Sequence, residues 1–193
     1  YATPFGVLTI ARTVVEALRG KIGFDGPAEA HIPEHSLELH TPFLAHLFGT
    51  VPIIPLVVGR VGGDGSVREL ARTLREVVGV DDLMVVSSDF THYGEAFHYR
   101  PFSAEVPEGL KKLADSAIRP ILDVDLAGFT GHIQETGDTI CGREPIRILL
   151  ASLPSSSRGS LSDFDTSGNM TGDFDHSVSY ASLLFSHPEG WKS

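Results

Sequence analysis

The sequence predicts an α/β protein in which amphipathic helices cover a layered sheet. Short apolar runs at residues 51–58 and 83–86 have the length of buried strands, and helical patterns precede, separate and follow them. This alternation favours a layered α/β sheet over a helix bundle or a β-sandwich. With 193 residues, of which 41% are hydrophobic and 21% charged, the chain has the size and composition of one globular domain.

Two helices are expected before the first strand. Residues 12–19 are helix-compatible and are followed by Gly20, a natural C-terminal stop. In residues 33–48, apolar side chains recur near helical spacing. Because Pro42 lacks the N–H that a helix interior needs, we expect this second helix to be broken in two.

The first strand and the third helix follow. Residues 51–58 are almost continuously apolar, and their two prolines favour a peripheral place in the sheet. Ser66 and Glu69 form a capping-box pattern, which predicts that a helix opens there and runs to about Val78. A second buried strand is then expected at residues 83–86.

The second half of the chain is expected to be mainly helical before it ends in strands. A long helical stretch at residues 107–135 should be interrupted near Pro120 and Asp123. A further helix is expected at residues 145–153, with its apolar residues on one side. Strands are expected at residues 159–166 and 176–185.

Charge and composition exclude several classes of partner. The net charge of −10 opposes binding to phosphate backbones, so we expect no nucleic-acid partner. No apolar run approaches the length that a membrane span requires, so no membrane partner is expected. Cys141 is the only cysteine, which excludes an internal disulfide and favours a reducing, cytoplasmic location.

The strongest local signal for chemistry is the segment VVSSDFTHYG at residues 85–94. It carries polar residues at the carboxyl end of an expected strand, where open α/β sheets bind their ligands. Asp89 lies three residues before His92 and could orient its imidazole for proton transfer. In the alternative interpretation, Asp89 caps a turn and His92 only packs. The local pattern leaves both open.

A second signal is the segment TICGREP at residues 139–145, where Cys141 precedes an expected helix. A helix N-terminus and the nearby Arg143 stabilise a thiolate, which suits a soft metal ligand or a redox-active sulfur. The alternative is a small buried hydrophobic residue, which is the more common role of a free cysteine.

A third group of residues lies between 31 and 46 and is rich in histidine and carboxylate. Within it, His35 and Glu38 are spaced to share one helix face, and we predict that they contact a ligand. The order does not match the HExxH pattern of zinc proteases. Elsewhere His98, His132 and His187 have no partner pattern and are left outside the predicted site.

Together these segments resemble successive motifs of the Memo family, whose prokaryotic members are called AmmeMemoRadiSam system protein B. The resemblance rests on EHSLELHTPFL at 34–44, PIIPLVVG at 52–59, VVSSDFTHYG at 85–94, TICGREP at 139–145 and SVSY at 177–180. The segment TPFG at residues 3–6 resembles the stretch that follows the family's second metal-binding histidine motif. We therefore expect residues 1–193 to be a single Memo-like domain that lacks its N-terminal part.

The resemblance implies a three-layer α/β/α fold with a mostly parallel or mixed central sheet, like that of class III extradiol dioxygenases. It also implies a pocket for one iron or copper ion, held by two histidines from preceding motifs and by Cys141. The family keeps Asp89 and His92 in the same pocket, and His92 matches the position of the catalytic base in the dioxygenases. With these, His35 and Glu38 are predicted to bind substrate.

The leading functional interpretation is a metal-dependent redox or oxygenase-like protein. The alternative is a non-catalytic protein that uses the same pocket to bind a small molecule, a peptide or its protein partners in the three-component AmmeMemoRadiSam system. A third alternative is a metal-independent hydrolase using His92 and Asp89. It is weaker because the sequence lacks the Gly-x-Ser-x-Gly motif that carries the nucleophile in many such enzymes.

Overall fold

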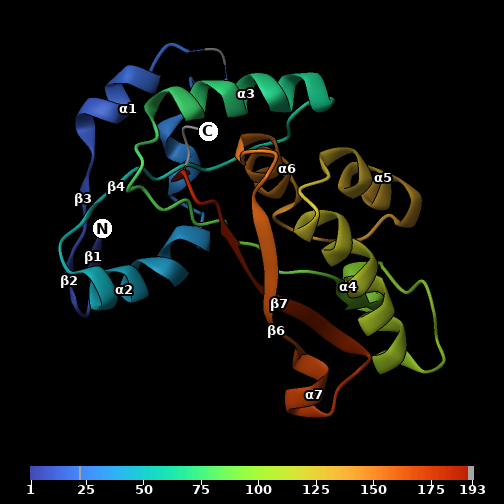
Figure 1. Ribbon diagram of the computed structural model, residues 1–193. Coiled ribbons are helices and arrows are strands. Elements are labelled where there is room, and N and C mark those ends of the chain that lie inside the picture. Colours follow the sequence, from blue (N-terminus) through green and yellow to red (C-terminus); the bar gives the residue numbers. More distant parts are fainter. Residues whose placement is uncertain (22, 191–193) are drawn as a thin grey trace.

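A computed structural model describes residues 1–21 and 23–190 and combines helices with small sheets, which confirms the predicted mixed α/β class (Figure 1). The helices are α1 Arg12–Leu18, α2 Ser36–Phe48, α3 Asp64–Val77, α4 Val106–Leu122, α5 Leu126–Thr136, α6 Arg143–Ser152 and α7 Ser167–Thr171, with 3-10 turns η1 Ala28–His31 and η2 Glu95–Phe97. The strands are β1 Ala2–Thr3, β2 Gly6–Val7, β3 Thr9–Ile10, β4 Pro52–Ile53, β5 His92–Gly94, β6 Arg158–Thr166 and β7 His176–Ser186.

The strands of the described residues form three separate sheets. Strands β1 and β2 pair antiparallel, β3 and β4 pair parallel, and the third sheet is antiparallel with the order β5-β7-β6. The long β6–β7 hairpin runs down the centre of Figure 1, with α7 at its lower end and α4 beside it. Because β7 also pairs with β5, this sheet fixes the chain at His92.

The core lies between the helices of the second half and α3. Its fully buried members include Val67 of α3, Ala114 of α4 and Phe129 of α5, and Ile146 of α6 packs with them. Helix α3 packs on α6, and α5 contacts both α4 and α6. The apolar faces of these amphipathic helices therefore pack together in one shared core.

The helices and the final strands were predicted well. The break in the long stretch falls at residues 123–125, between α4 and α5, and Pro120 is accommodated in the last turn of α4. The start of α3 differs from the prediction, since its N-cap is Gly63 and not Ser66. Asp64 then occupies the first turn, where a carboxylate favours the helix dipole.

The predicted break in α2 was wrong, because the helix runs through Pro42. Proline removes one N–H, which leaves the carbonyl of Glu38 without its usual partner. The hydroxyl of Thr41 lies 3.4 Å from that carbonyl oxygen and donates to it. A local side-chain donor thus replaces the missing backbone donor.

Of the two apolar runs predicted as strands, the first forms only the two-residue strand β4 and the second forms no strand among the described residues. Only Pro52–Ile53 pairs, with β3, and residues 83–91 have no regular secondary structure. Leu83 and Val85 are 63% and 45% exposed, so the apolar run is not covered on both faces. Apolar sequence favours an extended chain, but a strand also needs a partner backbone to complete its hydrogen bonds.

Candidate functional site

Two segments far apart in the sequence are joined at the start of β5. Thr139 makes the connection, because its hydroxyl accepts from the His92 N–H at 2.8 Å and lies 2.9 Å from the His92 carbonyl oxygen, to which it donates. A third bond joins the His92 ring to the Thr139 carbonyl. Thr139 was not singled out from the sequence, and its only signal was its place two residues before Cys141.

Cys141 lies at this junction, just before α6. Its sulfur accepts from the Asp89 N–H at 3.1 Å, and the Ser88 hydroxyl lies 3.9 Å away. The residue is exposed, which argues against a merely buried apolar role. The sequence prediction that the thiol precedes a helix N-terminus is confirmed.

Asp89 and His92 lie side by side in this cluster. The carboxylate Oδ2 is 3.6 Å from the ring Nε2. On the other side of the ring, Nδ1 is 3.1 Å from the Thr139 carbonyl oxygen, which can only accept, so Nδ1 carries a proton and donates it. In the neutral ring Nε2 is then unprotonated and can accept a proton.

Gly142 permits the close approach of the two segments. A Cβ at this position would lie 2.6 Å from the Ser88 hydroxyl oxygen and 2.7 Å from the Ser87 carbonyl oxygen. Instead the Gly142 N–H donates to the Ser88 hydroxyl at 2.9 Å. Glycine therefore holds Ser88 beside Cys141 without a clash.

Tyr180 of β7 also belongs to this neighbourhood. Burial raises the pKa of its phenol, and the charge of Asp89 raises it further. The phenol therefore stays protonated and able to donate near the carboxylate. The sequence analysis used Tyr180 for the family resemblance but did not assign it to the site.

A hollow of about 330 Å³ opens on one side of Cys141. Its walls combine apolar side chains with the charged Arg60, Arg143 and Glu144. Asp89 and His92 do not line it. Cys141 thus lines this hollow and also accepts from the Asp89 N–H.

The structure brings Asp89, His92 and Cys141 together, but His35 and Glu38 are positioned by α2. His35 is the N-cap residue of α2 and lies 3.8 Å from Glu34. Among the described residues, no recorded hydrogen bond or ion pair joins His35 or Glu38 to the Cys141 cluster. Their contact with a ligand stays a prediction.

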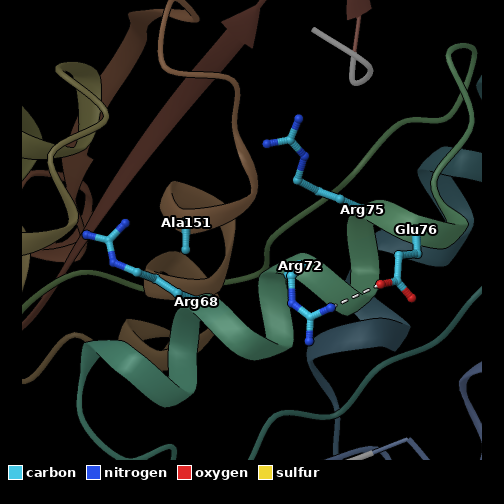
Figure 2. Close-up of a pocket in the computed structure, with 5 residues that line it drawn as sticks. All are labelled: Arg68, Arg72, Arg75, Glu76 and Ala151. Atoms are coloured by element: carbon cyan, nitrogen blue, oxygen red, sulfur yellow. Dashed lines mark hydrogen bonds and ion pairs between the residues drawn. The ribbon is translucent and has the colours of Figure 1, made fainter.

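A second hollow, of about 320 Å³, lies between α3 and α6 (Figure 2). Arg68, Arg72 and Arg75 line it from α3, and Arg72 is bonded to Glu76 at 3.3 Å. None of the predicted site residues lines this hollow. The geometry does not connect it with the Cys141 cluster.

The donor atoms near Cys141 do not form a complete metal site. A tight iron or copper site needs about three protein ligands of fixed geometry. In the part of the chain that the structure describes, no group of three or more His, Cys, Asp and Glu side chains is placed to hold a metal ion. Cys141 can supply one soft, exposed donor, and further donors are required.

Comparison with known proteins identifies the family. A model of the Memo-like protein family matches residues 1–184. The chain belongs to this family. It is 31% identical to the protein memo-1 homolog of Caenorhabditis elegans over 97% of the chain and 58% of that relative.

Archaeal relatives in the Memo family match equally well. The chain is 29% identical to a MEMO1 family protein of Thermococcus onnurineus, over 96% of the chain and 68% of the relative. It is 30% identical to one of Methanosarcina acetivorans, over 95% of the chain and 66% of the relative. The chain therefore spans between 58% and 68% of the length of these three relatives. Among the described residues, no helix has the length and apolar character needed to cross a membrane.

Proposed function

We propose that this chain carries the reaction pocket of a Memo-like redox or oxygenase-like protein, in which Cys141 is one ligand of a single iron or copper ion. The supporting observation is that the Cys141 sulfur accepts from the backbone N–H of Asp89, whose carboxylate lies 3.6 Å from the His92 ring, so that two distant segments meet here. The proposal includes a three-layer α/β/α arrangement like that of class III extradiol dioxygenases. The mixed α/β content of the described residues is consistent with it.

His92 is proposed to act as general base and Asp89 as its positioning residue. The Thr139 carbonyl holds the proton on Nδ1, so that Nε2 is free to take a proton from a bound molecule. The Asp89 carboxylate, 3.6 Å from Nε2, stabilises the imidazolium that this transfer creates. The His92 ring is held by the Thr139 carbonyl, and the main chain of Asp89 is held by its bonds to Cys141.

Cys141 is proposed as the soft ligand because its sulfur is exposed and faces a backbone donor. When bound, an iron or copper ion would supply redox chemistry that side chains lack. His35, the N-cap residue of α2, and Glu38 in its first turn are proposed substrate contacts. A cytoplasmic location accords with the exposed thiol.

Metal analysis tests the ligand assignment. The 193-residue chain is loaded without oxygen with Fe(II) or Cu(I), dialysed and analysed, and Cys141 is then alkylated with iodoacetamide. We expect little metal to survive dialysis, because Cys141 is the only assigned ligand. Bound Cu(I) should nevertheless slow alkylation, since it occupies the thiolate.

The matched variants are Cys141→Ala and His46→Ala, the latter on the exposed end of α2. Residual copper should fall in the cysteine variant and stay unchanged in the histidine variant. Stoichiometric metal in Cys141→Ala, or alkylation unaffected by Cu(I), would show that the ligand is wrongly assigned. An oxygen-consumption screen with Fe(II) or Cu(I) kept in the assay then separates a redox protein from the alternative, a non-catalytic binding partner.

A further inference from the structure

Ser116, His132 and Asp138 form a chain of hydrogen bonds apart from the Cys141 cluster. The Ser116 hydroxyl on α4 lies 3.2 Å from Nδ1 of His132 on α5, and Nε2 of His132 lies 3.0 Å from Oδ2 of Asp138. The side chains of His132 and Asp138 are 5% and 0% exposed, whereas Ser116 is exposed at the surface. A buried acid–base pair thus ends at an accessible hydroxyl.

The direction of these bonds follows from the carboxylate. An ionised Asp138 only accepts, so Nε2 of His132 carries the proton and Nδ1 directs its lone pair at Ser116. The charge on Asp138 also acts on Tyr99, whose pKa is raised to about 12 by burial first and by Asp138 second. The second carboxylate oxygen of Asp138 is buried without a hydrogen-bond partner among the described residues.

The hydroxyl proton of Ser116 has two acceptors. One is Nδ1 of His132, and the other is the Leu113 carbonyl oxygen at 2.7 Å. If the hydroxyl donates to Leu113, only a protonated Nδ1 can bond to the serine oxygen, and the ring is then an imidazolium beside Asp138. Nδ1 takes the Ser116 proton directly in the first arrangement, in which it is unprotonated, whereas the imidazolium of the second arrangement must first lose its Nδ1 proton.

A second serine–histidine pair, Ser156 and His187, serves as a comparison, because there the ring donates to the hydroxyl. The Ser156 hydroxyl lies 2.7 Å from Nε2 of His187, a shorter contact than that of Ser116. However, Nδ1 of His187 accepts from the Glu189 N–H at 3.1 Å, so in the neutral ring Nε2 is protonated and donates to Ser156. His187 therefore cannot take the proton of Ser156, and proximity alone does not make a base.

We propose that Ser116 is a base-activated nucleophile that accepts acyl or phosphonyl groups from activated donors, such as acyl phosphates and fluorophosphonates. In this step the Ser116 oxygen bonds to the carbonyl carbon or phosphorus and the bond to the leaving group breaks. The hydroxyl proton passes to Nδ1 of His132 and from there to the leaving group. Asp138 is a positioning residue that holds the tautomer and stabilises the imidazolium.

The surroundings of Ser116 indicate the class of donor. Lys112 and Arg119 lie one turn before and after Ser116 on α4, and both are exposed. Their positive charge favours a donor that carries negative charge, such as an acyl phosphate. Transfer from acetyl phosphate would leave an acetyl ester on Ser116 and release inorganic phosphate.

Covalent labelling tests the proposal. The chain is treated separately with a fluorophosphonate and with acetyl phosphate, and adducts are located by peptide mass spectrometry. We expect adducts on Ser116, formed on the order of 100-fold faster than on Ser156, because general base catalysis contributes about that much. Ser116→Ala should remove them, and Ser156→Ala should leave their rate unchanged.

Asp138→Asn tests the positioning role, since an amide would favour the wrong ring tautomer of His132. We expect labelling of Ser116 to slow by about 100-fold or more, with a changed pH profile. Absence of a Ser116 adduct, or equal rates at Ser116 and Ser156, would overturn the proposal. If Asp138→Asn fails to fold, the comparison of the two serines in the unmodified chain decides the question.

Discussion

At the residue scale, the hydrogen bond at one ring nitrogen of each histidine determines whether the other ring nitrogen carries a proton or a lone pair. His92 has a carbonyl acceptor on Nδ1, His132 has a carboxylate on Nε2, and His187 has an N–H donor on Nδ1. The first two rings therefore present a lone pair at the remaining nitrogen, and the third presents a proton. The same imidazole side chain is therefore a proton acceptor or a proton donor, depending on the hydrogen-bond partner of its other nitrogen.

Thr139 offers a test of how the His92 site is held. Thr139→Val keeps the side-chain shape but removes the hydroxyl that bonds both the N–H and the carbonyl of His92. We expect the free energy of unfolding to fall by about 1 to 3 kcal/mol, the cost of leaving partly buried polar groups unpaired. Urea unfolding measures this change.

The matched control is Thr139→Ser, which keeps the hydroxyl and should lose less stability than the valine variant. Nitrogen NMR of the His92 ring gives a second reading, because Nδ1 should be the protonated nitrogen in the parent chain. A parent ring protonated on Nε2 alone would contradict the assigned tautomer. Equal stability of the serine and valine variants would show that the hydroxyl is unimportant.

The residues of the Cys141 site and of the separate Ser116–His132–Asp138 chain were predictable only where a local sequence pattern marks them. Asp89 and His92 follow an apolar run, and Cys141 precedes a helix, so both segments could be recognised. Thr139 and the pair His132–Asp138 could not, because their partners are brought together by the turn at Gly137 and by the joining of distant segments. The spacing of these residues in the sequence does not predict such contacts.

At the element scale, helices were easier to predict than strands. A helix satisfies its backbone within itself, so periodicity at residues 106–122 and 143–152 was sufficient. A strand depends on a neighbour that its own sequence does not specify. The hairpin β6–β7 has that neighbour nearby in the chain, whereas residues 83–86 pair with no described strand.

Arg147 connects two elements and supplies a prediction about pH. From α6 its guanidinium donates to Asp64 at the start of α3 at 2.9 Å, to the Gly62 carbonyl at 3.1 Å and to Glu144 at 2.7 Å. Its side chain is only 9% exposed. Arg147→Met should reduce the free energy of unfolding by about 3 kcal/mol at neutral pH, because the acceptors lose a largely buried charged donor.

The effect of this substitution should shrink in acid. The hydrogen bond from Arg147 holds the pKa of Asp64 below its ordinary value, so this contact stabilises the fold above about pH 4 and is lost as the pH falls through the lowered pKa. Urea unfolding at neutral and acidic pH checks the sign. Arg147→Lys is the matched control and should retain part of the stability. A loss that does not change with pH would argue for packing alone.

At the scale of the whole molecule, burial is unevenly distributed. The apolar core is shared by α3, α4, α5 and α6, with Leu18 of α1 at its edge. Helix α2 contributes no buried residue to it and contacts the two-residue strands β1 and β2 (Figure 1). Along α2, Leu39, Phe43 and Leu47 are among the exposed apolar side chains. The proposed substrate contacts therefore stand on a helix that contributes no side chain to this core.

This distribution predicts that α2 opens before the core helices, because local opening is easiest where few apolar contacts are lost. Hydrogen exchange followed by mass spectrometry should show α2 amides exchanging on the order of tenfold or more faster than those of α4. Helix α4 is a matched reference, since it also contains an internal proline, Pro120, yet has five buried side chains. A difference between the exchange rates of the two helices would thus arise from the number of side chains packed in the core and not from an internal proline. Equal protection of the two helices would mean that contacts beyond the described core hold α2, and that His35 and Glu38 stand on a rigid surface.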